Sequence, residues 1–215
     1  MITVKGNFME TTTLVYFLTA SVMLTLAPGP DNMYLLSKSL ADGVRSGVAL
    51  SAGLSSGIVF HTGLVMMGIA ALIQSSPLAF TVLKFVGAGY LLYLAWQAFH
   101  AQGDLQLGEA GDTTPYGAIY RRGVLMNVLN PKVLLFFLAF LPQFIDKSSS
   151  AASWQIALLG AIFALQAFVI FSVIALCAGK VRDFIARKKN LNHTLGIVQG
   201  VVLLIISLAI LVTPA

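Results

Sequence analysis

Charge is scarce in this chain. Asp, Glu, Lys and Arg make up 10% of its 215 residues, whereas 58% of the residues are hydrophobic. A soluble domain carries about 25% charged residues, and the mean hydropathy of +0.88 lies far on the apolar side. The shortage of charge excludes an ordinary soluble domain and predicts an all-α integral membrane protein with one membrane domain.

Cysteine and metal-ligand patterns are scarce as well. The single Cys177 excludes an internal disulfide, and no apolar segment holds a His, Cys and Asp cluster suited to a metal ion. The stretch Gly53-Leu54-Ser55-Ser56-Gly57 matches the G-x-S-x-G pattern of hydrolases, but it lies within an apolar helix rather than between a strand and a helix. We therefore expect no enzyme, no cofactor and no metal site.

Basic residues outnumber acidic ones, which gives the chain a net charge of +5. They lie between the apolar segments, as topology signals do in membrane proteins. We therefore expect the lipid bilayer, and not a nucleic acid, to surround this chain. The composition leaves the oligomeric state open.

Long stretches without charge mark the membrane spans. Residues 46–83, 148–179 and 190–215 contain no Asp, Glu, Lys or Arg, and a spanning helix needs about 20 mainly apolar residues. The segment Gln74-Ser75-Ser76-Pro77 divides the first stretch into two spans. We predict six spans, at residues 12–38, 46–73, 78–99, 119–142, 154–178 and 195–213.

The start of the chain has some features of a secretory signal. Residues 14–27 have the length of its apolar region, but Glu10 precedes them and the basic region is thin. We therefore expect a short N-terminal segment at residues 1–11 and a first span that is retained. Met9 is an alternative start residue.

The basic residues also predict the orientation. If the six spans alternate in direction, nine basic residues share one side of the membrane: Lys38, Arg45, Arg121, Arg122, Lys180, Arg182, Arg187, Lys188 and Lys189. Cytoplasmic connections carry the excess of Lys and Arg. We therefore expect this side to be cytoplasmic and both termini to lie outside.

A polar connection at residues 100–114 divides the chain into two halves, residues 12–99 and 115–213. Three spans in each half give the halves opposite orientations, which is the inverted-repeat plan of many secondary transporters. We therefore predict a single six-helix transmembrane domain over residues 12–213, built from two inverted three-helix repeats.

The first and fourth spans each contain a second helix start. These are Gly29-Pro30-Asp31-Asn32 and Asn130-Pro131-Lys132, with Pro30 and Pro131 101 positions apart. Proline suits the first helical position, and glycine and asparagine suit the cap before it. The residue before a proline is pushed out of helical geometry, so we expect both spans to be broken at membrane depth.

Asp31 and Lys132 place opposite charges at these two starts. A charge within the membrane is costly and marks function by default. Lys132 beside a helix N-terminus requires an anion, such as a substrate carboxylate or Asp31, whereas Asp31 can receive an ammonium or a proton. The pair fits the head group of an amino acid. A structural ion pair between the two side chains, or simple proline kinks, are the alternatives.

The candidate site residues follow from these motifs. We predict that substrate binds at Pro28, Gly29, Pro30, Asp31, Asn32, Asn127, Asn130, Pro131 and Lys132. The candidates for proton coupling are Asp31 and His61, because histidine titrates near neutral pH. A lone histidine within a membrane is also often an interhelical hydrogen-bonding residue.

Pairs of glycine four residues apart allow helices to approach closely. Such pairs occur at Gly43 and Gly47, at Gly53 and Gly57, and at Gly196 and Gly200. We expect them to lie at helix interfaces.

The chain resembles the lysine-exporter (LysE/RhtB) family of amino-acid exporters. The residues that carry the resemblance are Leu26-Ala27-Pro28-Gly29-Pro30-Asp31-Asn32 in the first span and Asn127-Val128-Leu129-Asn130-Pro131-Lys132 in the fourth. Phe140-Leu141-Pro142-Gln143-Phe144 and residues 53–61 are also similar to the family. The resemblance implies a six-span protein of the bacterial inner membrane that exports amino acids, driven by the proton motive force.

The hypothesis from the sequence is therefore export by alternating access. A basic amino acid needs a second negative partner, and Asp31 is the acid available at membrane depth, so we favour neutral substrates such as threonine or homoserine. Efflux of a metal cation or another small ion, and a membrane scaffold that transports nothing, are the alternatives.

Overall fold

The structure is a computed structural model that describes residues 11–75, 77–100, 114–145, 151–187 and 191–212. The expected linker, the alternative start Met9 and two of the nine basic residues, Lys188 and Lys189, lie wholly or largely outside this range. The elements are α1 (Thr11–Leu26), α2 (Pro30–Asp42), α3 (Val44–Ser75), α4 (Pro77–Phe99), α5 (Tyr116–Val128), α6 (Pro131–Leu135), η1 (Phe136–Phe140), η2 (Leu141–Phe144), α7 (Ala152–Arg187) and α8 (Leu191–Val212).

The described elements are all helices, and they confirm a multi-pass membrane protein. Four stretches are long and apolar enough to cross a membrane: Val44–Gly68, Thr81–Phe99, Ala152–Ala178 and Thr194–Val212. Two further pairs of helices pass the same test together and are bent, by 58° between α1 and α2 and by 50° between α5 and the segment that follows it. The first and fourth spans are thus broken where the prolines predicted, and six spans result if each bent pair crosses once.

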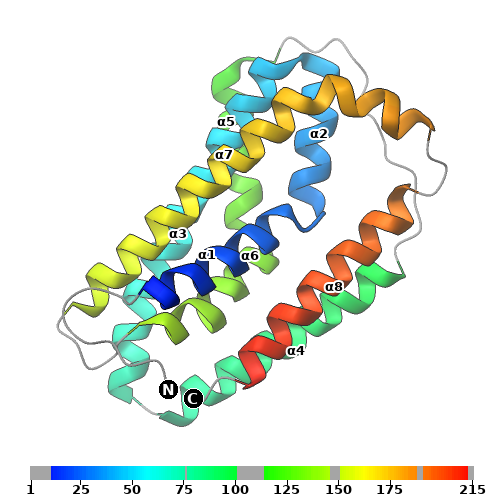
Figure 1. The fold of residues 1–215 in the computed structure, drawn as a ribbon. Coiled ribbons are helices and arrows are strands. Elements are labelled where there is room, and N and C mark those ends of the chain that lie inside the picture. Colours follow the sequence, from blue (N-terminus) through cyan, green and yellow to red (C-terminus); the bar gives the residue numbers. More distant parts are fainter. Residues whose placement is uncertain (1–10, 76, 101–113, 146–150, 188–190, 213–215) are drawn as a thin grey trace.

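Each half has the same order of elements, a bent pair followed by two long helices. In Figure 1, α1 and α2 run toward the end of the molecule where α3 begins, whereas α5, α6, η1 and η2 run the opposite way. The long helices associate between the halves, because α3 packs along α7 and α4 packs along α8. The two bent pairs therefore cross the molecule in opposite directions, as inverted repeats require.

The second half of the fourth span departs from the regular helix that the sequence predicted. After the short α6, Phe136–Phe140 is a turn of π-helix and Leu141–Phe144 is 3-10 helix. The amide of Gln143 donates to the carbonyl oxygen of Ala139 at 2.8 Å, which satisfies a carbonyl in this irregular segment. Pro142 lacks an N–H, which contributes to the change of helix type.

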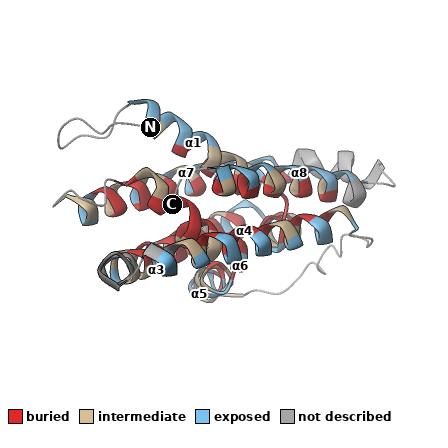
Figure 2. Cartoon of the chain, turned by 90° about the horizontal axis from the view of Figure 1, so that it is seen from below, coloured by how far each residue is buried: buried red, intermediate tan, exposed pale blue. Residues whose placement is uncertain are grey.

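Large apolar side chains cover the outside of the molecule. Val59, Met67, Leu165 and Leu176 are each more than 60% exposed, and Figure 2 shows exposed residues on the outward faces of the helices and buried ones between them. Water would penalise such a surface, whereas lipid does not. The exposed apolar faces therefore agree with a position in the bilayer.

Glycines allow α3 to approach α5 and α7 closely. A Cβ on Gly53 would lie 3.1 Å from the Cα of Gly123, and one on Gly57 would lie 2.7 Å from the Cβ of Asn127. In α7, a Cβ on Gly160 would lie 2.6 Å from Cγ2 of Thr62. Backbones in contact need this absence of side chains, so the glycines set the distance between the two halves.

Gly43 and Gly47, which the sequence predicted to lie at a helix interface, have different roles in the structure. Gly47 faces α7, since a Cβ there would lie 2.7 Å from the Cβ of Ala175. Gly43 has open space and a φ of 84°, so it forms the turn between α2 and α3 rather than a helix interface. The prediction was wrong for Gly43, because a left-handed backbone position favours glycine for conformational reasons.

Gly123→Ala should destabilise the protein, whereas Gly63→Ala should not. A Cβ at residue 123 would lie 2.7 Å from the carbonyl oxygen of Leu50, whereas one at residue 63 meets nothing within 4 Å. We expect Gly123→Ala to lower the free energy of unfolding by about 1–3 kcal/mol. Gly63→Ala should leave it unchanged or raise it by up to about 1 kcal/mol, because alanine favours a helix over glycine. Unfolding in mixed micelles would measure both, and equal effects would contradict the close α3–α5 contact.

Candidate functional site

The two helix breaks meet in the interior of the molecule. Asp31, Asn130 and Lys132 are all buried, with 5%, 6% and 7% of their surface exposed. The side-chain amide of Asn130 donates to Oδ2 of Asp31 at 2.6 Å. This hydrogen bond joins the start of α2 in the first half to the start of α6 in the second half, over 99 positions of sequence.

Asn130 is also the N-cap of α6. Its backbone is extended, and its side-chain oxygen accepts a hydrogen bond from the backbone N–H of Lys132 at 3.0 Å. Pro131 then takes the first helical position and is exposed. The cap and proline together stabilise a helix start in apolar surroundings, so one amide both begins α6 and holds Asp31.

The Lys132 side chain reaches across to the end of α1. Its ammonium donates to the carbonyl oxygens of Leu24 and Ala27, at 3.3 and 3.1 Å. The C-terminal end of a helix carries partial negative charge, which favours a cation. The expectation that Lys132 lacks a counter-charge unless an anion joins it was incomplete, because the carbonyl end of the other broken helix already contacts this ammonium.

Asp31 and Lys132 do not form a direct ion pair. No contact within 4.0 Å joins the carboxylate of Asp31 to the ammonium of Lys132, whereas Lys38 and Asp42 form such an ion pair at 2.5 Å near the end of α2. Asn130 lies between the two central charges and bonds to both residues. The alternative that Asp31 and Lys132 form only a structural ion pair therefore lacks the direct contact between the two side chains that it requires.

Side chains also bond to Thr25, near the end of α1, through its freed carbonyl and its hydroxyl. The amide of Asn32 donates to the carbonyl oxygen of Thr25 at 2.9 Å. The amide of Gln166, from α7, donates to the hydroxyl of Thr25 at 2.9 Å, and that hydroxyl donates to the carbonyl oxygen of Ser21 at 2.8 Å. Because lipid offers no hydrogen bonds, such contacts are what allow a helix to end at this depth.

Gly29 lets the lysine approach the break. A Cβ on Gly29 would lie 3.3 Å from the Lys132 nitrogen, which is tighter than ordinary contact. Pro28 is buried beside it, and Pro30 begins α2. These three residues set the shape of the break. Their side chains have no polar atoms, so they offer a substrate no side-chain hydrogen bond.

His61 bonds to a backbone carbonyl at the second break, between α5 and α6. Its Nε2 lies 2.9 Å from the carbonyl oxygen of Asn127, which also accepts the N–H of Asn130 at 2.9 Å. A carbonyl only accepts, so Nε2 carries the hydrogen. Within the described residues, Nδ1 of His61 and Oδ1 of Asn127 have no hydrogen-bond partner, although both are buried.

A small cavity lies between these groups. Its volume is about 20 Å³, which is room for about one water molecule. Its polar lining consists of Thr25, Asp31, Asn32, Asn127 and Lys132. Its apolar lining consists of Leu24, Ile58, Val133, Phe163, Ala167 and Phe171. The cavity is therefore closed to an amino acid in this conformation, although it has the polar and apolar sides that such a ligand needs.

The structure brings together most of the residues that the sequence singled out. Asp31, Asn32, Asn127 and Lys132 line the cavity, and Asn130 bonds to two of them. Neither Thr25 nor Gln166 is among the site residues that the sequence predicted. No motif marks either residue, since their contacts depend on how α7 packs against α1.

Metal-ligating side chains do not gather in the part of the chain that is described. No group of three His, Cys, Asp or Glu residues there is arranged to hold a metal ion.

Comparison with known proteins gives consistent matches over most of the chain. The family model described as LysE type translocator matches residues 22–213. A leucine efflux protein of Salmonella typhimurium (strain LT2) is 30% identical over 176 residues, which cover 81% of this chain and 83% of that protein. An uncharacterized membrane protein of Vibrio cholerae is 37% identical over 77% of this chain and 80% of its own length. No solved structure matches.

Lys132→Met should destabilise the fold, apart from any effect on transport. It removes the donor to two buried carbonyls at the end of α1, and an unsatisfied buried acceptor costs about 1–3 kcal/mol. We expect the free energy of unfolding in micelles to fall by roughly 2–3 kcal/mol. Arg121→Met removes an exposed cation from α5 and should change it by less than about 0.5 kcal/mol. Equal stability of the two variants would refute the capping role of Lys132.

Proposed function

The chain belongs to the LysE type translocator family, and on that premise we propose that it exports a neutral amino acid across the bacterial cytoplasmic membrane by alternating access. The observation that carries the proposal is the hydrogen bond of Asn130 to Asp31 where two oppositely directed broken helices meet. Inverted repeats with broken helices at the midplane are typical of secondary transporters.

In this proposal the substrate head group binds between Asp31 and Lys132. Two N–H groups of the Lys132 ammonium contact carbonyls, and an ammonium has three. A substrate carboxylate can accept a hydrogen bond from the third and, as it draws the ammonium toward itself, compete with those carbonyls for the other two. Asp31 accepts one hydrogen bond from Asn130, and a carboxylate has about four acceptor positions, so it can also bind a substrate ammonium.

Substrate binding would then weaken the contacts between the halves. The substrate ammonium competes with Asn130 for Asp31, and the substrate carboxylate competes with the α1 carbonyls for Lys132. Both contacts join the first half to the second. A ligand that replaces them lowers the cost of separating the halves, which is the differential interaction that any ligand-driven change requires.

The substrate class follows from the lining of the central cavity. A basic side chain needs a second acid, and Asp31 is the acid in the lining. The apolar side of the cavity, formed by residues such as Ile58, Phe163 and Ala167, suits an aliphatic side chain. The Salmonella relative is named a leucine efflux protein. We therefore place leucine-like substrates first and threonine or homoserine second.

For orientation and coupling we keep the predictions from the sequence. The side rich in Lys and Arg is cytoplasmic, both termini lie outside, and substrate enters from the cytoplasm. Protons drive export, and Asp31 carries them, whereas His61 holds the carbonyl of Asn127. Metal-cation efflux and a scaffold that transports nothing are the competing functions, and solute flux measurements separate them from amino-acid export.

Export from loaded cells or inverted vesicles tests the function. We expect export of leucine, isoleucine and valine, less of threonine and homoserine, and none of lysine. Asp31→Asn should lose most of the export, because it removes the charge that binds the ammonium. Asp42→Asn, at the far end of the same helix in an ion pair with Lys38, should retain it. No amino-acid flux in the wild type, or full export by Asp31→Asn with unchanged affinity, would refute the proposal.

His61→Gln separates a hydrogen-bonding role from proton transfer. The glutamine amide can donate to the carbonyl oxygen of Asn127 as Nε2 does. We expect this variant to keep most of the export, and a proton uncoupler to reduce export in both the variant and the wild type. If the variant exchanges substrate across vesicles but no longer responds to a proton gradient, His61 is the proton carrier instead.

A further inference from the structure

Six phenylalanines form a connected cluster beside the central cavity. They are Phe17 of α1, Phe136, Phe137 and Phe140 of η1, Phe144 of η2 and Phe163 of α7. The ring centroids of Phe17 and Phe144 are 5.5 Å apart, as are those of Phe136 and Phe163. Phe17 comes from the first half and the others from the second, so the phenylalanine cluster is a contact between the halves.

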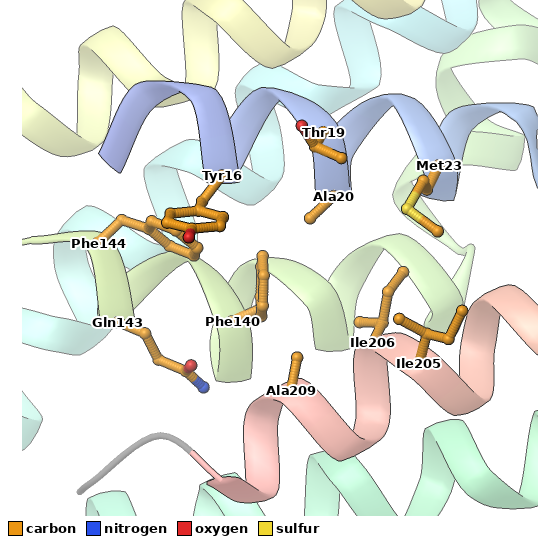
Figure 3. A pocket seen from close by; sticks show the side chains of 10 residues that line it. All are labelled: Tyr16, Thr19, Ala20, Met23, Phe140, Gln143, Phe144, Ile205, Ile206 and Ala209. Atoms are coloured by element: carbon orange, nitrogen blue, oxygen red, sulfur yellow. The ribbon is translucent and has the colours of Figure 1, made fainter. Parts of the chain in front are cut away.

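A second and larger cavity lies next to this cluster. It has a volume of about 320 Å³ and is bounded by α1, by η1 and η2, and by α8. Figure 3 shows Phe140 pointing toward α1. Most of the lining is apolar, and Tyr16, Thr19 and Gln143 add polar groups. The volume lies at the lower end of the range for small-molecule sites.

The phenylalanine cluster separates the two cavities. Phe163 lines the central cavity, and Phe140 and Phe144 line the larger one. Phe17 contacts the rings of both Phe163 and Phe144, at 6.4 and 5.5 Å between centroids. Apolar rings from both halves therefore fill the space between the charged centre and the larger cavity.

We propose that the phenylalanine cluster is a closed gate of the exporter, and that the larger cavity is the vestibule through which the amino acid leaves. The proposal rests on the proposed function and adds its release path. The phenylalanine cluster and the larger cavity each lie between α1 of the first half and elements of the second half. A path that opens when the two halves rock apart must lie between them in this way. The vestibule lies toward the end of the molecule where α1 begins and α8 ends (Figure 1), opposite the turn between α2 and α3.

Two features of the fold allow such a gate to open. The segment that carries four of the six rings changes from π-helix to 3-10 helix, and irregular helix of this kind often marks a hinge. On the other side, α1 is only partly covered, since Tyr16 is 58% exposed and Val15 is 56% exposed. The first half of α1 can therefore tilt away from the cluster while Lys132 and Gln166 still hold its C-terminal end.

Thiol labelling tests the vestibule without measuring transport. In a Cys177→Ser background, Ala20→Cys and Ala209→Cys place thiols on its walls, and Arg45→Cys marks the opposite end of the molecule. We expect a charged, membrane-impermeant methanethiosulfonate to label both wall positions from the membrane face at which Arg45→Cys is not labelled. Leucine should slow this labelling.

Leu18→Cys and Leu208→Cys are the matched controls for the vestibule. They lie beside wall residues on α1 and α8, are 37% and 49% exposed, and should face lipid and stay unlabelled. Absence of labelling at both wall positions would make the cavity a lipid groove and overturn the proposal. Labelling from the Arg45→Cys face, or labelling that leucine does not affect, would overturn it as well.

A thiol beyond the rings tests the gate. Val133 lines the central cavity and is 6% exposed, so Val133→Cys should be labelled slowly from the vestibule side. Adding Phe17→Ala should raise that labelling rate about tenfold, because it removes aromatic contacts that favour the closed state. Phe144→Ala provides the same test if Phe17→Ala does not fold. Phe168→Ala, a partly exposed residue of α7 outside the cluster, is the control.

The outcomes distinguish the gate from the function. Equal labelling of Val133→Cys with and without the cluster substitutions would overturn the gate even if the wild type exports leucine. Labelling as expected in a protein that exports no amino acid would refute the proposed function and with it the identity of the exported ligand.

Discussion

Breaking a helix inside a membrane leaves backbone groups that lipid cannot satisfy, and in this protein the two breaks are joined to each other. Lys132, at the start of α6, donates to the carbonyls at the end of α1, and Asn130, the cap of α6, holds Asp31 at the start of α2. Each half therefore supplies groups that the other half needs. The rest of the interior depends on this reciprocal contact, because the bonds within each half, from Asn32 to Thr25 and from Lys132 to Asn130, satisfy only part of each break.

The same contact gives the protein a way to respond to its substrate. Asp31 and the Lys132 ammonium are complementary to the amine and the carboxylate of an amino acid. In the closed conformation protein groups occupy them, and the cavity between them has room for about one water. An amino acid would thus bind by replacing contacts between the halves. The glycines of α3 keep those halves close along one side, so movement falls to α1 and the irregular segment opposite it.

The sequence predicted the features that depend on local chemistry. Proline and its neighbours set backbone geometry within a few residues, so the breaks at Pro30 and Pro131 and the cap at Asn130 could be located. The partner of Lys132 could not, because a long side chain can reach a carbonyl on another helix, and sequence spacing does not specify which one. The charge of Lys132 suggested a missing anion, whereas the fold supplied the end of α1.

The phenylalanine cluster was missed for a different reason. Phe136, Phe140 and Phe144 recur every four residues, which in an apolar helix is also the pattern of ordinary packing or of a lipid-facing surface. Only the position of Phe17 and Phe163 against them shows that the rings meet between the halves. Pro142 indicates an end to regular helix in this segment, but no local signal specifies the π-helix that precedes it.

The central claim is that the two broken helices bind the amine and the carboxylate of one amino acid. The most direct measurement is calorimetric binding to the purified protein of leucine, of 3-methylbutylamine, which lacks the carboxylate, and of 4-methylpentanoate, which lacks the amine. We expect leucine to bind at least about tenfold more tightly than either analogue, since each analogue leaves one buried charge without its partner. An analogue that binds as tightly as leucine would contradict the account.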